Sequence, residues 1–142
     1  MKISLNRIND DFLFECSNSA GNKILLDNAT LPDAKGVSPM EAVLMAVAGC
    51  SSIDIVSILK KQRQGITDFS AEVEGERIPK DDAKVFKTIT VNFSLSGNID
   101  PKKAYRAAEL SFEKYCSVSK TLEPNVEVKF SVKVNGELVE KN

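Results

Sequence analysis

The sequence predicts an α+β fold with a mostly antiparallel sheet and one long apolar helix near its centre. Segments with an apolar residue at every second position, typical of half-buried strands, lie toward both ends of the chain and after residue 66. The segment 38–61 is instead apolar at most positions and is bounded by helix-start and helix-end signals. The resulting order, β-β-β-α-β-β-α-(α)-β-β, is typical of α+β proteins. At 142 residues the chain is long enough for one domain over residues 1–142.

Three strands precede the long helix, over residues 2–8, 12–16 and 23–27. Polar turn residues separate them, at 9–11 and at 17–22. An antiparallel meander is therefore expected. A loop over residues 28–37 then leads to the long helix, and its length indicates a role beyond connection.

The long helix has clear signals at both ends. Ser38 is suited to the N-cap position, Pro39 to the first helical position, and Glu41 completes a capping box with Ser38. Basic residues fill the last turn and Gly65 is placed to end it.

The first half of this helix is too apolar for one small domain to cover. Every residue from Ala42 to Ala48 is apolar, so this half should be buried on all sides. After Cys50 the pattern is amphipathic, with Ile53, Val56 and Leu59 or Lys60 on one side. Either the sheet curls around the helix or a second chain completes the cover, and we expect a homodimer with extensive contacts.

After the long helix, two strands are predicted over 67–77 and 85–96, with a polar insert at 77–84 between them. A second helix is predicted from Asp100 and a short third helix at Cys116. Two further strands, over 126–134 and 137–139, complete the chain. Pro101 at the first position supports the second helix. Asn135-Gly136 is a type I′ hairpin signal between the last two strands.

The composition excludes several classes of function. A net charge of −1 gives no electrostatic reason to expect nucleic acid or an anionic membrane as a partner. The chain has no histidine, which excludes Ser-His-Asp and Cys-His hydrolases and His-ligated metal sites. The three cysteines lack zinc-ligand spacing, and no glycine-rich phosphate loop occurs. We therefore expect no metal and no organic cofactor, and chemistry that depends on thiols or carboxylates.

A cytoplasmic location is expected from two features. Residues 2–5 alternate in polarity, unlike a signal peptide. The longest continuous apolar run is well under the roughly 20 residues that cross a bilayer. In the cytoplasm the cysteines are expected to be thiols, and a disulfide between them to be transient and catalytic.

Two of the cysteines have plain structural interpretations. Cys16 alternates onto one face with Phe12 and Phe14, as a core residue does. Cys50, among Ala, Val and Met, also fits a helix core. However, Gly49 and the serines after Cys50 reduce the side-chain cover there and leave room for a small ligand or a close partner.

Cys116 lies where the second helix ends. A short helix beginning there would lower its thiol pKa, whereas the end of the preceding helix would raise it, and the sequence does not decide between the two effects. Asp54, one turn after Cys50, disfavours a thiolate at Cys50. Activation of Cys50 would thus need a cation from elsewhere in the fold.

Two motifs resemble the OsmC/Ohr family (osmotically inducible protein C and organic hydroperoxide resistance). SPMEAVLMAVAGCSSIDIVSILKK resembles its first-cysteine helix, which typically begins Ser/Asn-Pro-x-Glu and reaches an Ala/Gly-Cys. EKYCSVSKTL resembles its second-cysteine motif, in which Cys-Ser-Val-Ser is a variant of Cys-Pro-Val-Ser. EGER and KVFKTITVNFSL, between the two, fit the OsmC-like branch. The resemblance therefore covers nearly the whole chain.

This resemblance implies an intertwined dimer with two active sites at its interface, and thiol-dependent reduction of peroxides in defence against oxidative stress. Cys50 would be the peroxidatic nucleophile that becomes a sulfenic acid, and Cys116 would resolve it as a disulfide. A dithiol reductant, in the family a lipoyl protein or dihydrolipoamide, would reopen the disulfide.

The residues that activate the nucleophile differ from the family pattern. In its best-characterised peroxidases a Glu follows the Pro directly, but here that position is Met40, and Glu41 is explained equally well by capping. Those enzymes also use an N-terminal Arg. Arg7 does not match its loop, and Arg77 is the other candidate. Two alternatives therefore stay open: a non-catalytic dimer that binds a small apolar ligand or senses thiol redox state, and a structural dimer with both cysteines in its core.

Overall fold

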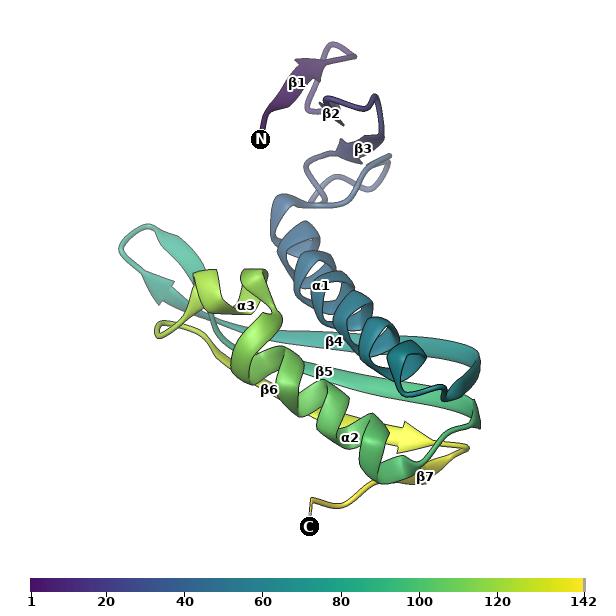
Figure 1. Cartoon of the computed structure of the whole chain (residues 1–142). Helices are drawn as coiled ribbons and strands as arrows, with labels where there is room; N and C mark the ends of the chain where they lie inside the picture. Colours follow the sequence, from purple (N-terminus) through teal and green to yellow (C-terminus); the bar gives the residue numbers. More distant parts are fainter. Residues whose placement is uncertain (142) are drawn as a thin grey trace. The chain divides into compact units, whose positions relative to one another are not determined.

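The computed structural model describes residues 1–141 and confirms a mixed α+β fold (Figure 1). The chain forms two compact units, Met1–Val43 and the part that begins at Leu44. The expectation of a single domain stays a prediction.

The first unit contains an antiparallel meander, as predicted. Its three strands, in sheet order, are β1 (Ile3–Arg7), β2 (Phe14–Asn18) and β3 (Lys23–Leu26). Strand β2 begins later than predicted because the Asn9 side chain accepts hydrogen bonds from the Asp11 and Leu13 amides, at 3.0 and 3.1 Å. These bonds hold the residues before Phe14 in a turn.

One face of this small sheet is apolar. Cys16 pairs with Leu5 on one side and with Ile24 on the other, so the three side chains share that face. Cys16 is 8% exposed, whereas Leu5 and Ile24 are more than half exposed. Phe12 lies outside the strand and is exposed, and the buried neighbour is Leu13.

The predicted loop at 28–37 is anchored to the sheet by backbone hydrogen bonds. The Val37 amide donates to Leu25 O at 3.2 Å and the Asp27 amide donates to Val37 O at 2.9 Å. The buried Asp27 carboxylate accepts from the Lys35 amide at 2.9 Å. A side chain at Gly36 would begin 2.7 Å from Leu25 O, so only glycine fits this approach.

Helix α1 (Pro39–Lys61) begins with the predicted capping box. The Ser38 amide donates to Glu41 Oε1 at 2.9 Å, and the Glu41 amide donates to Ser38 Oγ at 3.0 Å. The bonds from Ser38 hold the pKa of the Glu41 carboxyl below its usual value.

The end of α1 differs from the prediction. Arg63 adopts a left-handed conformation, with φ of 57°, and the Gln64 amide returns to Leu59 O at 2.9 Å. Arg63 therefore takes the place expected of Gly65, which begins the next strand.

The predicted buried side of α1 was wrong for Ile53, whereas Leu59, one of the two residues expected at its last position, is buried. The buried residues are Val47, Ser51, Ile55 and Leu59, at a spacing of four, while Ile53 is 71% exposed. The hydrophobic pattern did not reveal this buried stripe, because one of its four residues is a serine. The Ser51 hydroxyl donates to Val47 O at 2.8 Å within the helix, which satisfies its polar group and lets it face the core.

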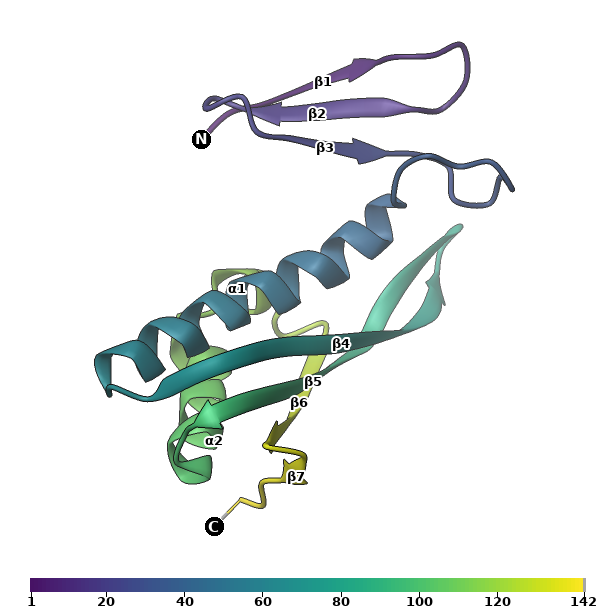
Figure 2. The ribbon, with the colours of Figure 1, turned by 90° about the vertical axis from the view of Figure 1, so that its right-hand side faces the viewer.

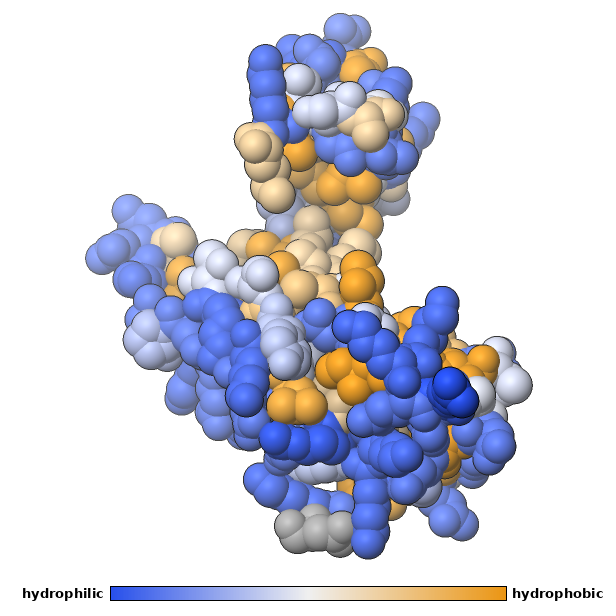
Figure 3. All heavy atoms as spheres, in the orientation of Figure 1, coloured by the Kyte–Doolittle hydropathy of each residue, from blue (hydrophilic) through white to orange (hydrophobic). Residues whose placement is uncertain are grey.

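Within the single chain α1 is not covered on every side. Figure 3 shows apolar surface along this helix, and Met45 as well as Ile53 is more than half exposed. By length and composition alone α1 could also cross a membrane, but core helices of globular proteins pass the same test. The short apolar run noted in the sequence therefore does not exclude a span by itself.

The second unit contains a four-stranded sheet in the order β4 (Gly65–Lys80), β5 (Ala83–Asn98), β6 (Glu127–Val134) and β7 (Glu137–Leu138). β5 and β6 pair in parallel, and the other two pairs are antiparallel. The predicted polar insert at 77–84 was wrong, because β4 and β5 stay paired as far as Lys80 and Ala83. Its residues are polar because this end of the hairpin is exposed.

One face of this sheet carries the core. The predicted inward residues Ile89, Val91, Phe93 and Leu95 are all buried. Helices α1 and α2 (Pro101–Leu110) lie on that face (Figure 2), where Phe112 stacks on Phe130 at 5.4 Å between ring centres. Asp100 caps α2 as predicted, accepting from the Lys102 amide at 2.9 Å.

The capping box generates the first prediction. Replacing Ser38 with alanine should lower the free energy of unfolding by about 1 kcal/mol, because the Glu41 amide loses its acceptor. Urea unfolding at neutral pH measures this change. Ser19→Ala, at an exposed turn position, is the control and should unfold as the wild type does. Equal stability of the two variants would contradict a stabilising cap.

Candidate active site

The structure brings Cys50 and Cys116 together within the second unit. Cys50 lies in the middle of α1 and is half-buried, whereas Cys116 is fully buried. Burial raises the pKa of the Cys116 thiol, and the Cys50 thiol is close enough to Cys116 to add to that rise. Cys16, in contrast, lies in the first unit on the apolar face of the small sheet. The two cysteines of the recognised motifs are therefore a pair.

An irregular helical segment positions Cys116. Helix α2 continues into a π-helix, η1 (Ser111–Tyr115), in which the Cys116 amide donates to Ser111 O at 2.7 Å. Cys116 then caps the short helix α3 (Ser117–Leu122), as predicted. π-Helical turns are rare and are often found at functional sites.

The backbone around Cys116 partly stabilises its sulfur. The Ser119 amide donates to Cys116 Sγ at 3.4 Å, and the Ser119 hydroxyl donates to the Cys116 carbonyl at 3.1 Å. Burial nevertheless raises the pKa of the Cys116 thiol, the Ser119 hydrogen bonds oppose that rise, and contact with Cys50 adds to it. The sequence did not decide whether the pKa of Cys116 is raised or lowered. The structure raises this pKa, so Cys116 is a protonated thiol at neutral pH.

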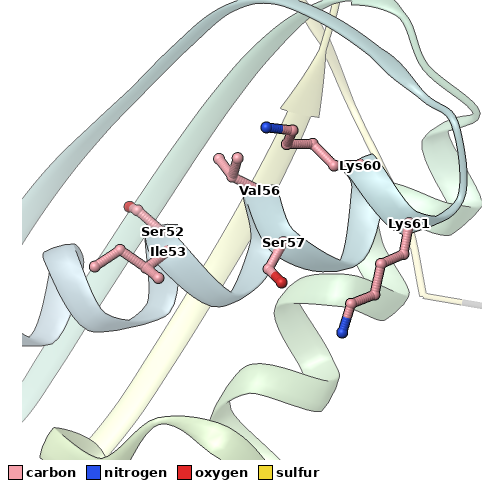
Figure 4. Close-up of a pocket in the computed structure, with 6 residues that line it drawn as sticks. All are labelled: Ser52, Ile53, Val56, Ser57, Lys60 and Lys61. Atoms are coloured by element: carbon pink, nitrogen blue, oxygen red, sulfur yellow. The ribbon is translucent and has the colours of Figure 1, made fainter.

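The helix surface beside Cys50 is open, as the sequence indicated. A side chain built at Gly49 would meet no atom within 4 Å. Beyond it, a shallow apolar depression of about 610 Å³ follows α1 (Figure 4). Its lining comprises Ser52, Ile53, Val56, Ser57, Lys60 and Lys61.

A second contact joins α1 to η1, and no sequence pattern indicated it. The Ser111 hydroxyl donates to Asp54 Oδ2 at 2.8 Å. Ser111 is fully buried, whereas Asp54 is half-buried and lines a cavity of about 590 Å³ together with Leu110 and Tyr115. Ser111 follows a helix whose buried residues are alanines, and in the sequence it resembles one more small core residue. Its hydrogen bond to Asp54 was therefore not predicted.

The three charged candidates for activating Cys50 all have local hydrogen bonds. Glu41 belongs to the capping box, and Arg7, also in the first unit, donates to Asp11 O at 2.7 Å. Arg77 lies on β4 and donates to Lys84 O at 3.3 Å. Among residues 1–141 no group of three or more Cys, Asp or Glu side chains is arranged to hold a metal ion.

Comparisons with known proteins agree with this architecture. The model of the OsmC-like protein family matches residues 32–131. Protein YhfA of Escherichia coli strain K12 is 40% identical over 117 residues, which are 82% of this chain and 85% of that protein. A hypothetical protein from Aquifex aeolicus VF5 shares 30% identity and a TM-score of 0.78, over 94% of this chain and 96% of that one. OhrB, the organic hydroperoxide resistance protein of Bacillus subtilis, shares the fold at 19% identity, with a TM-score of 0.65 and coverage of 93% and 96%.

The environment of the two thiols generates the second prediction. At neutral pH iodoacetamide should alkylate Cys50 faster than Cys116, because Cys116 is buried and its pKa is raised. Below that pKa the labelling of Cys116 should rise about tenfold per pH unit, following its thiolate fraction. Timed alkylation with peptide mass spectrometry measures both rates, and denatured protein is the control. Equal rates in the folded protein at neutral pH would contradict this assignment.

Proposed function

This chain belongs to the OsmC family, and we propose that it is a two-cysteine peroxidase that reduces organic hydroperoxides in defence against oxidative stress. The observation that supports the proposal is the pairing of a half-buried Cys50 with a buried Cys116. A solved structure with this fold is named an organic hydroperoxide resistance protein. The proposal includes a cytoplasmic location, where other thiols keep the pair reduced at rest.

In the first step the Cys50 thiolate attacks one oxygen of the hydroperoxide. An S–O bond forms while the O–O bond breaks, and the alkoxide takes a proton and leaves as an alcohol. The sulfur is oxidised by two electrons to a sulfenic acid, and the peroxide is reduced. Cys50 suits this step because it is the more accessible thiol and its neighbour Gly49 leaves the approach open.

In the second step Cys116 attacks the sulfenic sulfur. Its thiol proton combines with the departing hydroxide to form water, and the S–S bond forms between the two cysteines. The contact between the side chains is consistent with the Cα separation of under about 7 Å that a disulfide needs. An external dithiol of the dihydrolipoyl type then reduces the Cys50–Cys116 disulfide by thiol–disulfide exchange, and is itself oxidised to a disulfide.

The surroundings of Cys50 favour organic over charged peroxides. The exposed residues of α1 beside it, Ala46, Gly49 and Ile53, offer apolar surface. The nearest charged residue along the helix is the half-buried Asp54, whose carboxylate disfavours a second negative charge. An alkyl group can therefore pack against the helix while the O–O bond meets the sulfur.

We further propose that the chain acts as a homodimer. Both units carry uncovered apolar faces, one along α1 and one on the small sheet at Leu5 and Ile24. Contiguous apolar surface of this kind marks an interaction site. A second copy would cover the exposed part of α1.

A second candidate function is favoured by the charged residues. The hydrogen bonds of Glu41, Arg7 and Arg77 all go to residues near them in the sequence, so none of these three candidates activates a thiol through its hydrogen bonds. The protein would then be a non-catalytic dimer that binds a small apolar ligand or senses thiol redox state.

Intact mass after one equivalent of cumene hydroperoxide separates these functions and is the third prediction. The wild type should lose the mass of two hydrogen atoms as the disulfide forms, and Cys116→Ser should gain the mass of one oxygen atom as the sulfenic acid persists. Cys50→Ser should show neither change and no dithiol-dependent turnover. Cys16→Ser is the matched control and should behave as the wild type does. Full turnover by Cys50→Ser would exclude Cys50 as the nucleophile and contradict the proposed two-cysteine mechanism.

The fourth prediction concerns the dimer. Replacing Ile53, 71% exposed in the single chain, with lysine should shift the protein toward monomer, because the charge would be buried in the interface. Light scattering at micromolar concentration measures the mass. Leu138→Lys, at a position 54% exposed near the C-terminus, is the control and should leave the mass unchanged. A monomeric wild type would contradict the proposal.

A further inference from the structure

We infer that Asp54 and Ser111 are positioning residues that hold Cys116 against Cys50 for disulfide closure. The inference rests on the proposed function, because it assigns these residues to its second step. It is carried by the hydrogen bond of 2.8 Å between the Ser111 hydroxyl and Asp54 Oδ2.

The two pairs of residues are successive contacts between the same two segments. On α1, Asp54 follows Cys50 by one helical turn. On the other segment, Ser111 precedes Cys116 by one π turn, closed by the hydrogen bond of 2.7 Å from the Cys116 amide to Ser111 O. The segments therefore run antiparallel here, with the thiol pair at one contact and the hydroxyl–carboxylate pair at the next.

Ser111 connects the backbone of Cys116 to α1 through its own atoms. Its carbonyl accepts from the Cys116 amide, its hydroxyl donates to Asp54, and its amide donates to the carbonyls of Ala107 and Ala108 in α2. A displacement of Ser111 would thus move Cys116 relative to α1. The fully buried hydroxyl also needs its carboxylate partner, because an unsatisfied polar group in the core is costly.

The π turn explains why this connection reaches Cys116. In a regular α-helix, residues five apart are separated by about 500° of rotation, so 111 and 116 would lie on different sides of the helix. The i to i+5 hydrogen bond instead brings the Cys116 amide to the Ser111 carbonyl. The hydrogen bond from Ser111 to Asp54 therefore also fixes the start of the π turn that ends at Cys116.

Phe112 packs η1 against the sheet, where it stacks on Phe130, but on the side that faces α1 the junction borders a cavity. Asp54 lines a cavity of about 590 Å³ together with Leu110 and Tyr115, the residues that flank Ser111 and Cys116 in the sequence. Tyr115 is 56% exposed. With a cavity beside it, the hydrogen bond is the specific contact that orients η1 toward α1.

The fifth prediction separates positioning from general stability. In the full-length protein, Ser111→Ala and Asp54→Ala should each slow disulfide closure about tenfold, as loss of a hydrogen bond to a charged group does, and leave sulfenic acid formation within about twofold. Stopped-flow fluorescence with a sulfenate trap measures the two steps separately. Asp54→Asn keeps an acceptor and should retain most of the closure rate. The double variant should be no slower than either single one.

The matched control is Ser117→Ala, an exposed serine next to Cys116 with no side-chain hydrogen bond among the described residues. It should close at the wild-type rate. Slowing of both steps to the same extent, or closure at the wild-type rate in Asp54→Ala, would overturn the inference. If Ser111→Ala unfolds, Asp54→Ala, on the half-buried side of the pair, decides the question.

An equilibrium measurement keeps this test independent of the peroxidase. In glutathione redox buffers, the Cys50–Cys116 disulfide should be about tenfold easier to reduce in Ser111→Ala and Asp54→Ala than in the wild type, because the two thiols are less well held together. This result would support positioning even if no hydroperoxide were reduced. An unchanged equilibrium constant would overturn the inference and leave the proposed function standing.

Discussion

The buried stripe of α1 determines the positions of the other features of the second unit. Val47, Ser51, Ile55 and Leu59 fix how the helix is rotated about its axis. At about 100° per residue, Cys50 and Asp54 then flank this stripe, while Gly49 and Ile53 lie on the opposite side. The same rotation therefore aims the thiol and the carboxylate at η1 and leaves an apolar surface uncovered.

The alternation of apolar residues and the capping residues were sufficient to predict most of the fold. They identified the inward face of β5, the start of α1 at Ser38 and the start of α2 at Asp100. They failed where polar groups are satisfied locally. Ser51 bonds within its own helix and so lies in the core, and Asn9 bonds two amides and so delays β2. Neither hydrogen-bonding arrangement is visible in the hydrophobic pattern from which the strands and helices were predicted.

For the candidate site, the sequence predicted that Cys50 and Cys116 lie close together but not how they are held. Cys50 and Cys116 were selected by motifs, and the structure brings them together. The π turn and the bond between Ser111 and Asp54 could not be predicted, because both depend on contact between segments that are distant in the chain. Helical periodicity treats Ser111 as one more small residue beside the alanines of α2.

The burial of Cys116 places a particular demand on the proposed second step. A raised pKa reduces the thiolate fraction at neutral pH by about tenfold for each unit. Holding two reacting groups in place can raise the rate far more, since effective molarities of well-oriented groups reach about 10⁵–10⁸ M. Proximity can thus outweigh the loss of ionisation, but only while Cys116 stays aligned with Cys50. This makes the orientation of η1, rather than the acidity of Cys116, the property on which disulfide closure depends.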